Sequence, residues 1–306
     1  MWLIVLVTLA GFIYWARENR QVRALLSEKV DIPPQKTAAP PPQPPPRSPA
    51  PEKAEFPEKP SQLPQTLASR REEAPSPPKE TALPPPMARV AIVIDDLGQD
   101  LEIAKKFLQV PLLLTFSVLP FQQHSREIAD LAHEHGREVL VHLPMEPKDY
   151  PKTHPGQGAL LVSMSRSAIQ KALREALDSI PHASGVNNHM GSRFTESPEL
   201  MGIILTDLRQ RDLYFLDSYT SGRSVCTTLA SQLDLPSLRR HVFLDHQDSK
   251  ILVERQIELL IRKARVEGAT VAIGHPRKTT LDVLHARVEH FRKEEVQVVP
   301  ARELLP

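Results

Sequence analysis

The chain has 306 residues, which is enough for one or two domains. Its 38 lysines and arginines are balanced by 37 aspartates and glutamates, so its charge gives no support to a nucleic-acid-binding protein. The single cysteine, Cys226, excludes an intrachain disulfide and a zinc site built from cysteines. Proline is unevenly distributed, because 19 of the 31 prolines lie between Pro33 and Pro86.

The N-terminal segment predicts a membrane anchor. Its first 16 residues carry no charged side chain and would span roughly 24 Å as a helix, against ~30 Å for a bilayer core. Trp2 and Trp15 suit the two membrane interfaces. We interpret residues 1–20 as an uncleaved anchor, with a cleaved signal peptide as the alternative. Arg17 and Arg20 follow the apolar run, which by the positive-inside rule favours a cytoplasmic C-terminal side, so the residues alone leave the side of the membrane open.

Residues 21–87 form the predicted linker. Most of this stretch is rich in proline, alanine, glutamate and lysine and has almost no aliphatic clusters, so it lacks the apolar surface that folding requires. Its proline runs favour extended polyproline II structure. We therefore expect a disordered, semi-rigid spacer, with recognition by a proline-binding module as the alternative.

From Arg89 onward, short apolar runs alternate with amphipathic segments of helical length. We expect strands at Val90–Ile94, Leu112–Leu119, Glu138–Leu143, Gly185–Met190, Leu213–Asp217, His241–Asp245, Thr270–Gly274 and Val296–Val299. We expect helices at Ser125–His135, Ser167–Ile180, Ser197–Arg211, Ser249–Glu267 and Thr280–Arg292.

This alternation predicts a parallel β/α architecture for residues 88–306. The number of β/α units favours a distorted, closed or nearly closed barrel over an open doubly wound sheet. No glycine-rich phosphate loop follows any expected strand, so no nucleotide site is expected.

The first expected strand ends in two adjacent carboxylates, Asp95 and Asp96, followed by Gly98, which allows the chain to turn. Neighbouring side chains on an extended chain point to opposite sides. We therefore expect one carboxylate to bind a cation while the other faces a water molecule or a proton. An isolated Asp-Asp pair would more commonly only end a strand and begin a turn.

Other expected strands also end in polar residues, and in β/α barrels the active site lies at the carboxyl ends of the strands. These residues are His142, His189, Asp217, Asp245 and His275. A single histidine in such a place is more often structural, but aspartate and histidine at six strand ends are harder to explain without a shared site.

Two imidazoles and one carboxylate are a ligand set suited to Zn²⁺, with a fourth position for water. A second carboxylate can accept the proton of that water, and another histidine can protonate a leaving group. The residues therefore predict a metal-dependent hydrolase of amides or esters. We expect Cys226 to lie in a loop and not to act as a nucleophile.

Five motifs in order resemble the divergent polysaccharide deacetylase family of bacteria over about residues 88–306. They are Ile94-Asp95-Asp96-Leu97-Gly98, His142-Leu143-Pro144-Met145-Glu146-Pro147, Asn187-Asn188-His189-Met190-Gly191-Ser192, Phe215-Leu216-Asp217-Ser218 and Gly274-His275-Pro276. The family is similar to carbohydrate esterases that remove N- or O-acetyl groups from cell-wall polysaccharides. The resemblance implies an irregular (β/α)₇ barrel with an Asp-His-His metal site.

The resemblance also implies roles for individual residues: Asp95 as general base, Asp96 and His142 as metal ligands, and His275 as general acid. The ordinary deacetylases have their second histidine ligand four residues after the first, and this chain has Glu146 there. His189 is the favoured replacement, with Glu146 as the alternative ligand.

The Arg-x-Pro motif of the ordinary enzymes is missing, so substrate handling is expected to differ. We consider Arg193, Asp217 and Asp245 as candidates for contact with the glycan. The sequence thus predicts a metal-dependent enzyme that deacetylates an envelope polysaccharide or peptidoglycan. The resemblance implies that the domain faces the periplasm or cell exterior, with the N-terminal segment anchored in the inner membrane, and this outweighs the positive-inside argument. The alternative is a non-catalytic glycan-binding or envelope-assembly protein that keeps the barrel.

Overall fold

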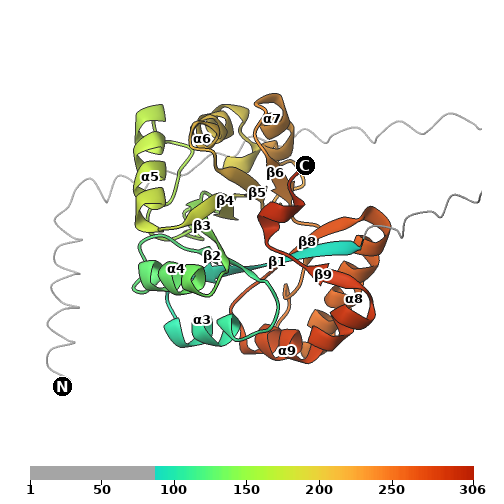
Figure 1. Cartoon of the computed structure of the whole chain (residues 1–306). Coiled ribbons are helices and arrows are strands. Elements are labelled where there is room, and N and C mark those ends of the chain that lie inside the picture. Colours follow the sequence, from blue (N-terminus) through green and yellow to red (C-terminus); the bar gives the residue numbers. More distant parts are fainter. Residues whose placement is uncertain (1–86) are drawn as a thin grey trace, which may run out of the picture. The chain divides into compact units, whose positions relative to one another are not determined.

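The computed structural model describes residues 87–306 (Figure 1). The predicted anchor at 1–20 lies outside the described residues, as does the predicted linker except for Met87. Within 87–306, no helix combines the length and apolar character that crossing a membrane requires.

A single curled sheet of parallel strands organises the described residues (Figure 1). Its strands are β1 (Ala88–Leu97), β2 (Thr115–Val118), β3 (Glu138–Met145), β4 (Ala183–Met190), β5 (Tyr214–Asp217), β6 (Ser237–Arg239), β7 (Val242–Phe243), β8 (Ala269–Gly274) and β9 (Val296–Val298). Their order is β6-β5-β4-β3-β2-β1-β8-β7, and β9 pairs with β1. This half-barrel with flanking helices confirms the predicted distorted β/α barrel.

Helices connect the strands and cover the outside of the curled sheet (Figure 1). The α-helices are α3 (Leu101–Leu108), α4 (Ser125–Glu134), α5 (Arg166–Ser179), α6 (Pro198–Gln210), α7 (Cys226–Gln232), α8 (Lys250–Glu267) and α9 (Lys278–Lys293). Two 3₁₀ turns complete the set, η1 (Phe194–Glu196) and η2 (Ala301–Leu304). Ser197 caps α6 by accepting a hydrogen bond from the Leu200 backbone N–H, and Gly268 ends α8 with φ 81°, which agrees with the expected helices Ser197–Arg211 and Ser249–Glu267.

The structure differs from the sequence-based elements in four places. The second expected strand is shorter, because the Leu112 N–H donates to the Val110 carbonyl and the Leu114 N–H to the Leu112 carbonyl, which turns that apolar run. Strand β6 has three residues, and α3 and α7 are short, so none gives a strong periodic pattern. Cys226 begins α7 and is buried, so its expected position in a loop was wrong.

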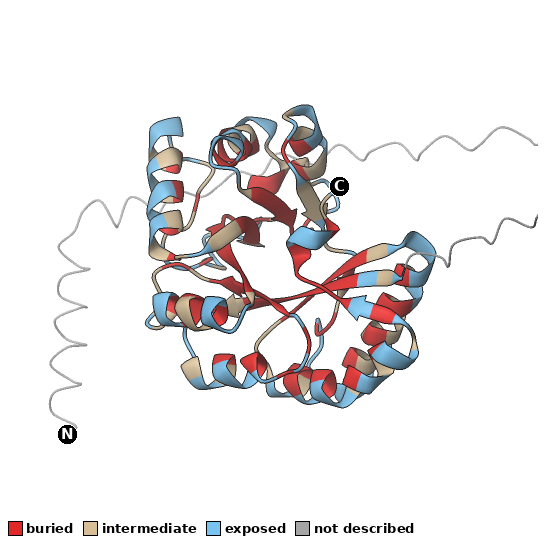
Figure 2. Cartoon of the chain, viewed as in Figure 1, coloured by how far each residue is buried: buried red, intermediate tan, exposed pale blue. Residues whose placement is uncertain are grey.

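The strands divide the core into two parts. In β1, Val90, Ile92 and Ile94 pack among the residues of the outer cluster between sheet and helices, whereas Ala91 and Val93 belong to a second, inner cluster. Figure 2 shows buried residues along most of the sheet.

The C-terminal segment completes the inner cluster, because Val299, Ala301 and Leu304 pack within it. The Ala301 N–H donates to Oγ1 of Thr115, the first residue of β2. The C-terminal segment therefore lies at the amino ends of the strands, and it leaves the carboxyl ends for the polar residues.

Candidate metal and catalytic site

The period of two along the strands places several polar side chains inside the barrel. Ala91 and Val93 of β1 face the inner cluster, and Asp95 continues the same series. In β3, Leu140 faces inward and is followed in the series by His142. His275 likewise follows Ile273 of β8. Asp95 and His142 are buried, and His275 is half-buried.

Asp96 breaks this alternation. Its φ of 58° is in the left-handed region, and the pairing of β1 with β2 shifts register between Ile94 and Leu97. As a result both neighbouring carboxylates approach Nε2 of His142, Asp96 through Oδ1 at 3.0 Å and Asp95 through Oδ2 at 3.6 Å. The expectation that they point to opposite sides was wrong, because it assumed an extended backbone. Strained backbone of this kind concentrates at functional sites.

Asp96, His142 and His189 converge on one point. Oδ1 of Asp96 lies 3.0 Å from His142 Nε2 and 2.8 Å from His189 Nδ1, and the two ring nitrogens are 3.2 Å apart. Ligands placed 2.0–2.1 Å from a tetrahedral zinc ion would be separated by about 3.3 Å. Within residues 87–306, these are the three side chains that form a group capable of holding a metal ion.

The electrostatics of the group favour a cation. Oδ1 of Asp96 is buried and, despite the short distances, has no hydrogen bond of acceptable geometry to any described residue. Burial lowers the pKa of His142, but the Asp95 and Asp96 carboxylates outweigh burial and raise it to about 9. Burial raises the pKa of Asp96, but the two imidazoles hold it well below its usual range. A proton or a divalent cation can therefore occupy the space between these atoms, and the residues fit a metal ion.

Asn187, which the sequence analysis did not select, orients this group. Its Oδ1 accepts a hydrogen bond from Nδ1 of His142 at 2.9 Å, which leaves Nε2 of that ring free to act as a ligand. Its Nδ2 donates to Oδ1 of Asp95 at 2.8 Å. The available signal was its place in β4, two residues before His189 and therefore on the same side of the strand.

His275 is held by Asp245. Nδ1 of the imidazole lies 2.8 Å from Oδ1 of Asp245, and Oδ2 accepts from the His275 backbone N–H and from Thr280 Oγ1 at 2.7 Å each. Burial lowers the pKa of His275, but Asp245 and the nearby carboxylates raise it above its usual value. Nε2 of His275 is 3.8 Å from Oδ2 of Asp96, so the ring faces the group of three.

These contacts give Asp245 a different role from the predicted one. It is 0% exposed and both its oxygens are engaged, so it positions His275 and has no free atom for a glycan.

Asp217 also lies outside the group. It has the same parity as Phe215, which packs in the outer cluster, and its oxygens accept from the Tyr219 N–H and the Ser224 hydroxyl. Burial raises the pKa of Asp217. The geometry therefore directs this carboxylate toward the loop before α7 and does not favour the predicted contact with substrate.

Glu146, the alternative third ligand, is engaged elsewhere. Its Oε1 pairs with Arg193 at 2.9 Å and its Oε2 accepts from the Val162 N–H at 2.7 Å. The structure thus gathers His189, and not Glu146, with Asp96 and His142. Arg193 keeps 53% of its side chain exposed beside this pair.

A model of the divergent polysaccharide deacetylase family matches residues 92–305. An uncharacterized protein of Haemophilus influenzae is 36% identical over 212 residues, which are 69% of this chain and 75% of the relative. The uncharacterized protein YibQ of Escherichia coli K12 is 36% identical over 217 residues, which are 71% of this chain and 67% of the relative.

The fold has a counterpart among solved structures. An uncharacterized protein of Agrobacterium tumefaciens C58 has a TM-score of 0.69 and 24% sequence identity, and the match covers 71% of this chain and 89% of that one. The family model confirms the resemblance that the motifs indicated. The chain belongs to the divergent polysaccharide deacetylase family.

Proposed function

We propose that the protein is a zinc-dependent hydrolase that removes acetyl groups from an envelope polysaccharide or peptidoglycan. The observation that carries this proposal is the convergence of Asp96, His142 and His189, with a further carboxylate, Asp95, and a further imidazole, His275, beside them. The family membership supports an acetylated glycan as substrate.

Asp96, His142 and His189 would hold the ion through Oδ1, Nε2 and Nδ1. When bound, a divalent ion supplies Lewis acidity, which polarises an acetyl carbonyl and lowers the pKa of a water molecule. Zn²⁺ suits the ligand set, because imidazole nitrogens and one carboxylate are its common partners.

Asp95 is the general base in this proposal. Burial raises the pKa of the Asp95 carboxyl group toward neutral pH, which makes the carboxylate a stronger base. The Asn187 amide holds one oxygen, and the other oxygen remains 3.6 Å from His142 Nε2 on the side of the ligand group. That oxygen accepts the proton of the water that attacks the acetyl carbonyl.

His275 is the general acid. Asp245 fixes its Nδ1, so the proton available for transfer is on Nε2, which faces the ligand group. That proton goes to the sugar nitrogen or oxygen as its bond to the acetyl carbon breaks, and acetate leaves. The raised pKa of His275 keeps this proton available near neutral pH.

We further infer an inner-membrane protein whose residues 88–306 face the periplasm or cell exterior. The apolar N-terminal 16 residues and the proline-rich stretch that follows support an anchor and a spacer. An acetylated envelope glycan would be within reach on that side of the membrane.

Metal analysis of the purified full-length chain, together with acetate release from peptidoglycan fragments and chitooligosaccharides, tests the proposal. We expect about one zinc ion per chain and acetate release that stops when the ion is chelated. A wild-type chain that releases no acetate from any acetylated glycan, combined with an Asp95→Asn chain that still complements a deletion strain, would refute catalysis. The protein would then be a glycan-binding or envelope-assembly protein.

A further inference from the structure

Among the cationic side chains around the carboxyl ends of the strands, five fall into two groups with different partners. In the first group, each cation is neutralised by a carboxylate. Arg193 pairs with Glu146 at 2.9 Å, and Glu196 pairs with both Lys148 at 2.6 Å and Arg223 at 2.8 Å. All three cations follow β3, β4 or β5.

The second group consists of Arg240 and Arg277, which we name the seam arginines. Neighbouring Arg239 is set apart from them, because it pairs in register with Asp217, whose side chain faces the outer layer. Neither seam arginine has a carboxylate within 4.0 Å among residues 87–306. Backbone carbonyls hold them instead. Arg240 donates from Nε to the Ser218 carbonyl at 2.7 Å and from Nη2 to the Tyr219 carbonyl at 3.0 Å. Nη1 of Arg277 donates to the Asp245 carbonyl at 2.6 Å.

The seam arginines lie where the two ends of the sheet meet. Arg239 is the last residue of β6, and Arg240 and His241 alone link it to β7. The Arg240 guanidinium lies 4.8 Å from the ring centre of Phe243, which is in turn 5.4 Å from the ring of His275. Arg277 is two residues beyond His275 and caps α9, so the positive end of that helix faces the same region.

These guanidinium groups keep unused donors. Arginine carries five N–H donors. Within residues 87–306, Arg240 spends two of them and Arg277 spends one. Burial lowers the pKa of Arg240, against the attraction of Asp95 and Asp217.

Asp217 does not neutralise this cation directly, because its oxygens accept from the Tyr219 N–H and the Ser224 hydroxyl. A partly buried cation that is fixed by carbonyls and lacks an ion pair is costly, and an anionic ligand would offset the cost.

We propose that the seam arginines bind a carboxylate carried by the acetylated glycan, on the side of the site next to His275. The guanidinium fork matches a planar carboxylate through two parallel hydrogen bonds, which a neutral sugar cannot supply. This inference rests on the proposed function for the choice of an acetylated glycan. It adds that the preferred sugar is acidic.

A pair of acetylated disaccharides that differ by one lactyl ether group tests the inference. The disaccharide of N-acetylglucosamine and N-acetylmuramic acid carries the lactyl carboxylate, and N,N′-diacetylchitobiose, the neutral disaccharide, does not. Calorimetric titration of the metal-loaded full-length chain should show at least about tenfold tighter binding of the acidic sugar, and the difference should shrink as salt is raised. Equal affinity for both sugars would overturn the inference. So would tighter binding of N-acetylglucosamine 6-phosphate than of the acidic disaccharide, because the site would then be a phosphate site.

Two variants and a control identify the residues. Arg240→Gln and Arg277→Gln should each reduce the preference for the acidic sugar several-fold and leave binding of the neutral disaccharide unchanged. Arg277 donates one side-chain hydrogen bond within residues 87–306, so its variant remains informative if Arg240→Gln fails to fold. Arg302→Gln removes the same charge at the amino ends of the strands and should keep the full preference. Retention of the preference in Arg277→Gln and in a folded Arg240→Gln chain would contradict the assignment.

Binding separates this inference from the proposed function. A chain that prefers the acidic sugar but releases no acetate refutes only the deacetylase activity. A chain that deacetylates both sugars and binds them equally refutes only the role of the seam arginines.

Discussion

A buried carboxylate lies at the amino ends of the strands and another lies at their carboxyl ends, and the surroundings of these two carboxylates differ. At the amino ends of the strands, Glu138 accepts four hydrogen bonds, from the hydroxyls of Thr115, Ser184 and Tyr214 and from the Arg302 backbone N–H. At the carboxyl ends, Asp95 accepts from Asn187 with one oxygen, and its other oxygen faces His142 at 3.6 Å.

The difference separates a carboxylate held by neutral donors, Glu138, from the carboxylate that we propose as the general base, Asp95. The partners of Glu138 are neutral donors, and burial raises the pKa of Tyr214 well above its usual value, so this phenol remains a donor at neutral pH. Glu138 thereby fastens the C-terminal segment to β3 across 164 residues. Asp95 lies instead among imidazoles and a second carboxylate, where protons can be exchanged.

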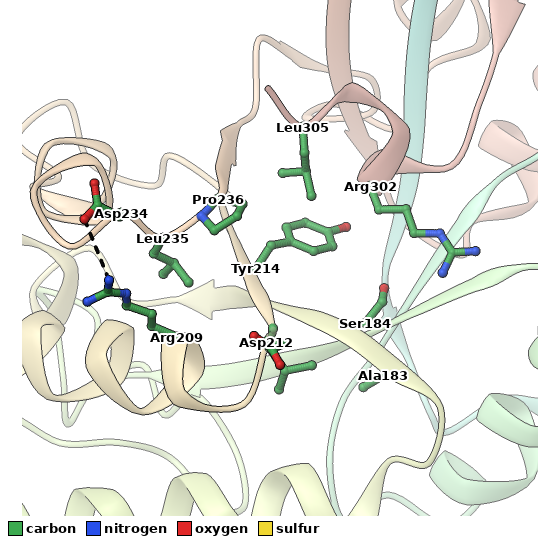
Figure 3. Close-up of a pocket in the computed structure, with 11 residues that line it drawn as sticks. Ala183, Ser184, Arg209, Asp212, Tyr214, Asp234, Leu235, Pro236, Arg302 and Leu305 are labelled. Carbon is green, nitrogen blue, oxygen red and sulfur yellow. Dashed lines mark ion pairs between the residues drawn. The ribbon is translucent and has the colours of Figure 1, made fainter.

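The cavity in Figure 3 does not lie at the group of Asp96, His142 and His189. This cavity of about 650 Å³ opens at the amino ends of the strands, lined by Tyr214, Ser184 and Arg302 among others. In that view Arg209 pairs with Asp234, at 3.7 Å, on one side of the cavity. The lining contains none of the residues that converge on the metal group, so the chemistry is identified by side-chain geometry and not by volume.

The largest expected effect comes from removing a metal ligand, because the carboxyl ends of the strands would then lose the property that distinguishes them from the amino ends. Asp96→Asn and His189→Ala should each lose the bound ion and all acetate release, because a neutral amide is a poorer ligand than a carboxylate and alanine offers none. Metal content after dialysis measures this. Glu146→Gln is the matched control and should keep the ion, since Glu146 pairs with Arg193. Full metal in His189→Ala would show that another residue completes the set.

The second prediction exchanges a carboxylate for an amide at the carboxyl ends of the strands (Asp95) and at their amino ends (Glu138). Asp95→Asn should keep its ion and fold but lose on the order of 10²–10⁴ in turnover, because an amide cannot accept the proton of water. Glu138→Gln should keep its turnover per folded molecule. Acetate release normalised to metal content compares them. Similar losses of turnover in both variants would mean that the two ends are not functionally distinct.

Asn187→Ala sharpens the comparison at the carboxyl end. We expect metal affinity to fall by about 10–100-fold, because His142 loses the partner that fixes its ring and tautomer. Competition with a chelator measures the affinity. The adjacent Asn188 accepts a hydrogen bond from the Ser218 backbone N–H and donates one to the Met190 carbonyl. Because these partners are backbone groups and not the His142 ring, Asn188→Ala should leave metal affinity closer to that of the wild type. An unchanged affinity in Asn187→Ala would argue against its orienting role.

The smallest effect is expected at the amino end and concerns stability alone. Glu138→Gln places an NH₂ group where donors already point, which should cost about 1–3 kcal/mol of unfolding free energy. For a domain of this size, each kcal/mol lowers the melting temperature by roughly 2–4 °C. Thermal unfolding measures the shift. Glu303→Gln, on the exposed side of the same C-terminal segment, should not change the melting temperature.

The sequence by itself determined the alternation of strands and helices, and it placed the polar residues at the carboxyl ends of the strands. The apolar runs of β1 and β3 are continuous, so they show that both faces are buried and not which face is inward. Once the inner cluster identifies the inward face, the period of two assigns Asp95, His142 and His275 to it. The motifs added the family. Local backbone geometry and local side-chain size were sufficient for the alternation and for the place of the polar residues at the strand ends.

Only the tertiary structure decided which polar residues meet. The left-handed conformation of Asp96 directs it to His142, and a salt bridge with Arg193 engages Glu146. Asp245 lies behind His275, and Asp217 faces the outer layer. These outcomes depend on contacts between residues far apart in the chain, such as Asn187 with Asp95, which are 92 positions apart, and on a backbone bend within one strand. Sequence periodicity describes an extended strand. It therefore cannot report where a strand bends, or which of several carboxylates is engaged by a salt bridge outside the site.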